Sequence, residues 1–172
     1  HELCTDVLKK CITCLRCKPR PAFKSQKVER RHFESVPWAK THIDIWDAGR
    51  HDSKGKRYLL AVTDELTGYT DGVPLSSKNE KMVVEALLTL VLRNGILGSN
   101  VIISDNGSEL SSIWDEVVRC LNLNHIRTTS YMSQSNGKIE RVFRELNIKF
   151  KILNTHIKHW SIYLPYVLFI IN

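Results

Sequence analysis

Apolar and polar residues follow two different periods along the chain, and the change of period separates strands from helices. Three segments rich in β-branched and aromatic residues, 38–49, 56–64 and 68–75, are typical of strands. The turns between them are short, so these three segments predict an antiparallel meander. Residues 100–104 and 125–129 are two further predicted strands.

Apolar residues recur at helical spacing in four other segments. The predicted helices cover residues 76–95, 111–121, 136–154 and the chain from residue 160. In the first of them, Ser77 and Glu80 fit a capping box, and Gly95 is a natural stop. The longest predicted helix has an apolar stripe that consists of Ile139, Val142, Phe143, Leu146, Phe150 and Leu153.

The order of these elements predicts the fold class. A meander of three strands is followed by helices that alternate with strands, and a crossover helix between two strands indicates that they pair in parallel. The expected fold is therefore α/β, with a mixed sheet of antiparallel and parallel strands and helices on both faces. This is the ribonuclease-H-like plan.

Length and composition limit the domain organisation. The 172 residues, 42% of them hydrophobic, fit one domain with a small appendage. We expect residues 37–172 to form the domain, residues 21–36 a basic linker interrupted by prolines, and residues 1–20 a separate remnant. No leader pattern and no apolar run of about 18 residues is present, so we expect neither secretion nor a membrane partner.

Positive charge is concentrated near the two ends of the chain. Residues 1–36 carry nine Lys or Arg against four Asp or Glu, and residues 138–158 carry six against two. The residues between these segments carry ten against twelve, so the middle of the chain is slightly acidic. Basic flanks suit contact with phosphates, whereas a solvated charged surface is the structural alternative.

Acidic residues at strand ends are the candidate chemistry. Asp105 follows the apolar run VIIS, and Asp44 lies between two isoleucines, where an unpaired carboxylate is costly to bury unless a metal or a partner compensates. Asp47 has the opposite strand parity to Asp44, and both Asp47 and Asp64 suit turn capping. Glu140 lies near the start of the long helix, where it is either a third member of the site or a surface residue paired with a neighbour.

Three sequence blocks together resemble the integrases of long-terminal-repeat retroelements, both gypsy-type retrotransposons and retroviruses. WAKTHID places Asp44 six residues after a tryptophan, SDNGSEL contains Asp105, and SQSNGKIERVFREL contains Glu140. Sixty residues separate the first acid from the second, and 34 separate the second from the third. CITCLRCK near the start and HWSIYLPYVLFIIN at the end extend the resemblance over nearly the whole chain.

The resemblance implies an enzyme, a polynucleotidyl transferase and endonuclease with an Asp-Asp-Glu triad. Asp44, Asp105 and Glu140 would be both catalytic residues and ligands of Mg²⁺ or Mn²⁺, since ligands that are all oxygen favour these ions over zinc. Two such ions roughly 3.5 to 4 Å apart suit in-line attack on a phosphodiester. The implied reactions are trimming of the 3′ ends of element DNA and their joining to target DNA.

The resemblance also implies partners and further site residues. We expect Gln134, Asn136, Arg144 and Lys151 to contact DNA, with a solvated helix surface as the alternative for the two basic residues. The chain would act as a homo-oligomer, a dimer or a tetramer, in the nucleus or otherwise in a cytoplasmic particle. Residues 134–137 correspond to a mobile loop beside the substrate in this family.

The cysteines match the family only in part. Cys11 and Cys14 form the second half of a His-His-Cys-Cys zinc site, and zinc would bind only if the missing first half were present. Cys120 is expected to be a small core residue. Ser133 replaces a proline that is usual in the family, and the 34-residue spacing is one shorter than in retroviruses.

Two other functions remain open from the sequence. A domesticated or truncated copy would keep the fold and bind DNA or protein without catalysis, although all three acids are present. A transposase or nuclease of the same fold would share the metals but not the substrate. We expect the chain to end inside its last core helix, as a fragment of a larger product would.

Overall fold

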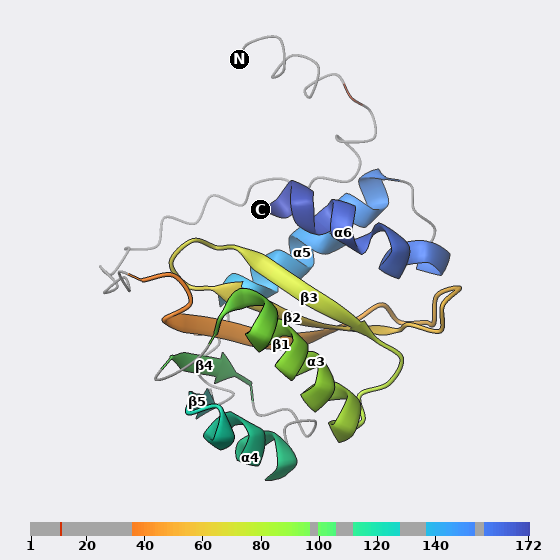
Figure 1. The fold of residues 1–172 in the computed structure, drawn as a ribbon. Helices are drawn as coiled ribbons and strands as arrows, with labels where there is room; N and C mark the ends of the chain where they lie inside the picture. Colours follow the sequence, from red (N-terminus) through yellow and green to blue (C-terminus); the bar gives the residue numbers. More distant parts are fainter. Residues whose placement is uncertain (1–10, 12–35, 97–99, 106–111, 128–136, 154–156) are drawn as a thin grey trace, which may run out of the picture.

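A five-stranded mixed sheet forms the centre of the protein, with strand order β3-β2-β1-β4-β5 (Figure 1). The computed structural model describes residues 11, 36–96, 100–105, 112–127, 137–153 and 157–172. The strands are β1 (Lys40–Asp47), β2 (Tyr58–Asp64), β3 (Thr70–Leu75), β4 (Val101–Ser104) and β5 (Asn124–Arg127). As predicted, β1, β2 and β3 form an antiparallel meander, whereas β4 pairs in parallel with both β1 and β5.

The helices follow the predicted order. They are α3 (Glu80–Asn94), α4 (Ser112–Cys120), α5 (Gly137–Ile152) and α6 (Trp160–Ile171), and a 3₁₀ turn, η1 (Ile157–His159), precedes α6. Gly95 ends α3 in the left-handed conformation, with φ of 66°, and its N–H donates to the carbonyl of Val91. Helix α4 connects β4 and β5, which pair in parallel, and this confirms the crossover expectation; α3 leads from β3 at one edge of the sheet to β4 on the far side of β1.

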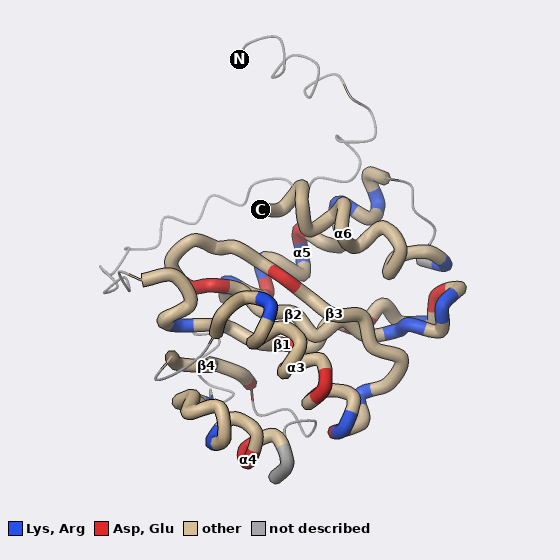
Figure 2. Tube along the Cα trace, in the orientation of Figure 1, with Lys and Arg blue, Asp and Glu red and all other residues tan. Residues whose placement is uncertain are grey.

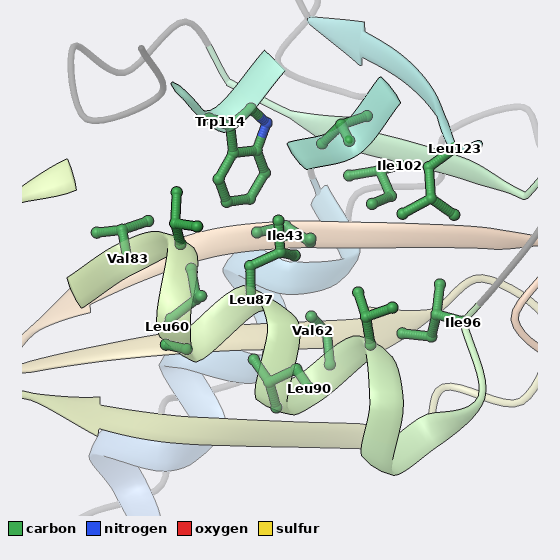
Figure 3. Packing of buried hydrophobic residues seen from close by; sticks show 14 of the residues in the cluster. Ile43, Leu60, Val62, Val83, Leu87, Leu90, Ile96, Ile102, Trp114 and Leu123 are labelled. Carbon is green, nitrogen blue, oxygen red and sulfur yellow. The ribbon is translucent and has the colours of Figure 1, made fainter. Parts of the chain in front are cut away.

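Each face of the sheet carries its own hydrophobic core. On one face, α3 and α4 pack on Ile43 of β1 and on β2, and Trp114 of α4 and Leu87 of α3 lie close to Ile43 (Figure 3). On the other face, α5 and α6 pack on Leu59 and Ala61 of β2. Because successive residues of a strand point to opposite faces, β2 contributes to both cores and is almost entirely buried. The ribonuclease-H-like α/β prediction with helices on both faces is confirmed.

The start of α3 differs from the capping-box prediction. Asn79, and not Ser77, is the N-cap, because its side-chain oxygen accepts the N–H of Met82 at 2.9 Å. Ser77 Oγ instead accepts the N–H of Asn79 at 3.4 Å, one turn before the helix. The Ser77 prediction is therefore wrong, since the residue directly before the helix is a better capping residue.

Two other predictions about burial also fail. Cys120 is exposed, because it lies at the solvent-facing end of α4. Leu153 is 41% exposed and lies beyond the last residue of α5, so the apolar stripe of that helix ends at Phe150. The remaining stripe residues do pack on the sheet. No helix within the described ranges has both the length and the apolar character needed to cross a bilayer.

Candidate active site

Asp44 lies in the middle of β1, on the face of the sheet that α5 covers. Its neighbours Ile43 and Ile45 point to the opposite face, where both pack in the core under α3. Asp44 is paired with Ala61 of β2, which belongs to the core under α5. The carboxylate is partly buried, and its Oδ1 accepts the N–H of Ile45 at 2.7 Å. Strand alternation alone therefore places this carboxylate beneath the helix that carries Glu140.

Asp105 directly follows the last residue of β4. The parallel register pairs Thr41 with Ile102 and His42 with Ile103, and the same register continued by two residues brings Asp105 beside Asp44. Both aspartates line one pocket, together with Ile43, Ile45, Leu60, Lys78 and Ser104. The end of β4 is held by Ser104, whose Oγ lies 2.7 Å from Nε2 of His125 on β5. Two residues 61 positions apart in the sequence thus meet at one strand end.

Glu140 lies in the first turn of α5 and is exposed. The residue before it, Ile139, is fully buried in the core under α5, so the helix is docked on the sheet at this turn. Glu140 does not line the pocket that Asp44 and Asp105 share. Its negative charge nevertheless raises the pKa of Asp44.

Burial raises the pKa of Asp44 to about 6 from the usual 3.8. The hydrogen bond from the N–H of Ile45 lowers this pKa, whereas the negative charges of Asp105 and Glu140 raise it. The positive charge of Lys78 is a smaller effect that lowers it. A carboxylate held among like charges is poised to bind a cation, since a cation would offset both the repulsion and the lost hydration.

The chemistry of the donors fits Mg²⁺ or Mn²⁺. Asp44, Asp105 and Glu140 offer only oxygen, and these ions prefer carboxylate oxygen to nitrogen or sulfur. The structure brings two of the three predicted ligands to one pocket. Among the residues that it describes, no three His, Cys, Asp or Glu side chains lie close enough together to hold one ion. Glu140 is therefore near the aspartates but outside a compact group with them.

Asp47 and Asp64 have the turn-capping roles that the sequence favoured. Asp47 accepts the N–H of Gly49 at 2.7 Å and binds the guanidinium of Arg57 through both oxygens, which lowers the pKa of Asp47. Asp64 accepts the N–H and the hydroxyl of Thr67, and it also accepts the N–H of Trp38 at 2.9 Å. Both carboxylates accept hydrogen bonds from their own turns and from one residue farther away, so their oxygens are already engaged within the fold.

The predicted DNA-contacting residues are only partly within the described ranges. Arg144 and Lys151 are exposed on α5, on the surface that also carries Glu140. Figure 2 marks the basic and acidic residues along this helix. Gln134 and Asn136 lie outside the described residues. Cys14 does too, and Cys11 is partly buried, so the zinc half-site stays a prediction.

Sequence reasoning missed Lys78, which lines the pocket with the two aspartates. Its ammonium group lies 5.4 Å from the centre of the Tyr58 ring, and its charge lowers the pKa of Asp44. Only its position in the first turn of a predicted helix could have suggested it, because no local pattern relates Lys78 to Asp44. The meeting of these two residues is a product of the fold.

The sheet order and the two carboxylates at neighbouring strands define the class: this is a ribonuclease-H-like domain with an acidic pocket at the end of a parallel strand. A chain of the simian T-cell lymphotropic virus intasome in complex with the PP2A regulatory subunit B56 gamma has this fold. The match has a TM-score of 0.60 at 17% identity, and it covers 99% of the present chain and 58% of that chain.

Curated relatives give the particular family. The chain is 32% identical over 119 residues to the Gag-Pol polyprotein of feline leukemia virus, and 27% identical over 121 residues to the retrovirus-related Pol polyprotein from transposon 412 of Drosophila melanogaster. These matches cover 67% and 69% of the chain, but only 7% and 10% of the relatives. No protein-family profile matches the chain. The chain is a homologue of the integrase-like region of retroviral and retrotransposon Pol polyproteins.

Proposed function

We propose that the chain cuts and joins DNA as an integrase, trimming the 3′ ends of element DNA and transferring them to target DNA. The observation that carries the proposal is the meeting of Asp44 and Asp105 in one pocket, with the pKa of Asp44 raised by the charges of Asp105 and Glu140. The homology to one region of Pol polyproteins supports it.

In this proposal, Asp44, Asp105 and Glu140 hold Mg²⁺ or Mn²⁺. The chemistry that these ions supply when bound is activation of a water or of a DNA 3′-hydroxyl and stabilisation of the leaving oxygen. The protein itself provides the geometry: β1 and β4 hold the two aspartates on one rigid sheet, and α5 brings the glutamate to the same face. No covalent bond between protein and DNA is needed.

DNA would approach along the exposed surface of α5. Arg144 and Lys151 lie on this surface, four and eleven residues after Glu140, so phosphates bound there would pass close to the acidic residues. The matched structure is described as a viral intasome, and we propose that this chain acts on DNA as a homo-oligomer. Integration into chromosomal DNA would require it to act in the nucleus.

The direct test is a DNA-cleavage and joining assay. The whole chain is incubated with Mg²⁺ or Mn²⁺ and a labelled duplex that carries the terminal sequence of its own element, beside Asp105→Asn. Asp115→Asn is a matched control, because Asp115 on α4 pairs with Arg127 at 2.7 Å and does not line the pocket. We expect shortened and joined products from the wild type and from Asp115→Asn, and none from Asp105→Asn.

A second function, DNA binding without catalysis, is favoured by the position of Glu140 outside a compact group with the aspartates. In that case all three proteins would bind the duplex in a gel-shift assay, and none would yield product. Equal product from the wild type and Asp105→Asn would instead contradict the assignment of this carboxylate.

A further inference from the structure

A buried group of polar side chains links the sheet to the first turn of α5. His42 on β1 is 2% exposed, and Glu65, the residue after β2, is 6% exposed. Nε2 of His42 is hydrogen-bonded to Oε2 of Glu65. Lys138 of α5 donates to the carbonyl of Glu65, and its Nζ lies 3.4 Å from Glu65 Oε1. We call His42, Glu65 and Lys138 the α5 clamp.

Glu65 is the acidic centre of the clamp, and both of its partners favour its ionised form. Burial opposes ionisation of Glu65, but the hydrogen bond from His42 and the positive charges of His42 and Lys138 outweigh it and lower the pKa of Glu65. Glu65 is therefore an anion at neutral pH, and Nε2 of His42 is the donor in their hydrogen bond. The N–H of Glu65 also donates to the carbonyl of Lys40 at 2.9 Å, which ties the anion to the start of β1.

Two clamp residues lie two positions from a proposed metal ligand: His42 precedes Asp44 on β1, and Lys138 precedes Glu140 on α5. His42 and Asp44 are alternate residues of β1, so they point to the same face of the sheet. Lys138 and Glu140 are both in the first turn of α5, with the fully buried Ile139 between them. The ion pair of Lys138 and the burial of Ile139 together fix the distance of this turn from the sheet and its rotation about the helix axis. The direction in which Glu140 projects follows from that rotation.

We propose that the α5 clamp positions Glu140 relative to Asp44. His42, Glu65 and Lys138 act through the backbone of the two elements and are positioning residues. The inference rests on the proposed function, because Glu140 is assigned to the metal site there. The first turn of a helix lacks internal partners for its N–H groups and frays readily, so an anchor is most effective at this end.

The test compares Lys138→Met and Glu65→Gln with Lys149→Met. Lys149 is on the same helix and pairs with Glu145 at 3.3 Å, so its change removes a lysine and an ion pair from α5 outside the clamp. Lys138→Arg keeps a cation with donors. Three measurements are made on the whole chain: the dissociation constant for Mn²⁺ alone, hydrogen exchange of the backbone amides in the first two turns of α5, and kcat and KM for DNA cleavage.

We expect both clamp variants to bind Mn²⁺ about 10- to 100-fold more weakly, as is usual when residues behind metal ligands are changed. The amides of the second turn of α5, which donate to the carbonyls of the first turn, exchange faster than in Lys149→Met, and Lys138→Arg retains most of the Mn²⁺ affinity. The double variant loses no more than the worse single variant, because either change opens the same clamp. In DNA cleavage, kcat falls and KM for DNA stays constant.

Other outcomes would overturn either the clamp or the proposed function, and the measurements distinguish the two. Folded Lys138→Met with wild-type exchange in the first turns of α5 overturns the clamp. A loss confined to KM for DNA, and absent from Glu65→Gln, also overturns it, since Lys138 would then be a phosphate contact. If the wild type neither binds Mn²⁺ nor cleaves DNA, the proposed function fails, and the exchange comparison alone still decides whether the clamp holds α5.

Discussion

Removing the charge of Asp44 should make the protein more stable at neutral pH. The pKa of this carboxyl is raised to about 6 in the folded protein from the usual 3.8, so its ionised form is less favourable in the folded state than in the unfolded state. A shift of about 2 pKa units corresponds to about 3 kcal/mol at about 1.36 kcal/mol per unit. We expect Asp44→Asn to recover about 1 to 3 kcal/mol of this at pH 7.5.

The sign of the pH dependence follows from the raised pKa. Below the unfolded-state value of 3.8, Asp44 is protonated in both states and imposes no penalty. The penalty grows as pH rises through the interval between 3.8 and about 6 and is complete above it. The gain from Asp44→Asn should therefore be largest at neutral pH and disappear near pH 3.8. The substitution preserves the acceptor for the N–H of Ile45, so the hydrogen bond at this position is kept.

Thermal unfolding with EDTA present is the assay, because a divalent ion would stabilise only the wild type. For a domain of this size, each kcal/mol corresponds to about 2 to 4 °C in Tm. Asp47→Asn is the matched control from the same strand. The hydrogen bonds from Arg57 stabilise the ionised form of Asp47 and lower its pKa, so this variant should not be more stable than the wild type. An Asp44→Asn protein with the wild-type Tm at neutral pH, or with a gain that persists at pH 3.8, would refute the electrostatic reasoning.

Three further predictions concern the cap, the strand packing and the DNA surface. Asn79→Ala should lower the free energy of unfolding by about 1 kcal/mol through loss of the N-cap, whereas Ser77→Ala should change it by less than half as much; urea denaturation of both variants tests the assignment. Gly72→Ala should cost about 1 to 3 kcal/mol in the same assay, because its Cβ would lie 2.7 Å from Cδ1 of the buried Leu59. Arg144→Ala should reduce the salt dependence of DNA affinity by about one unit of slope, measured by fluorescence anisotropy, and an unchanged slope would exclude a phosphate contact.

Most of the fold could be predicted from local patterns. The five strands and four helices lie within a few residues of their predicted positions, because a strand with one or two buried faces and a helix with one apolar stripe leave different periods in the sequence. The preference for Asp44 over Asp47 was also available locally, since strand parity separates their directions. The errors at Ser77 and Cys120 lie at helix ends, where the local pattern determines neither the exact first residue of the helix nor the exposure of its last residue.

By itself, the sequence determined the order and type of the elements and the acidic residues at their ends, since these depend on neighbours a few positions away. Tertiary structure alone decided which of those residues meet. The parallel register of β1 and β4 brings Asp105 to Asp44, the end of β3 brings Lys78 to the same pocket, and the buried Glu65 joins β1 to α5 through His42 and Lys138. Such contacts depend on register and on helix rotation, which arise when whole faces are buried together and which no short stretch of sequence encodes.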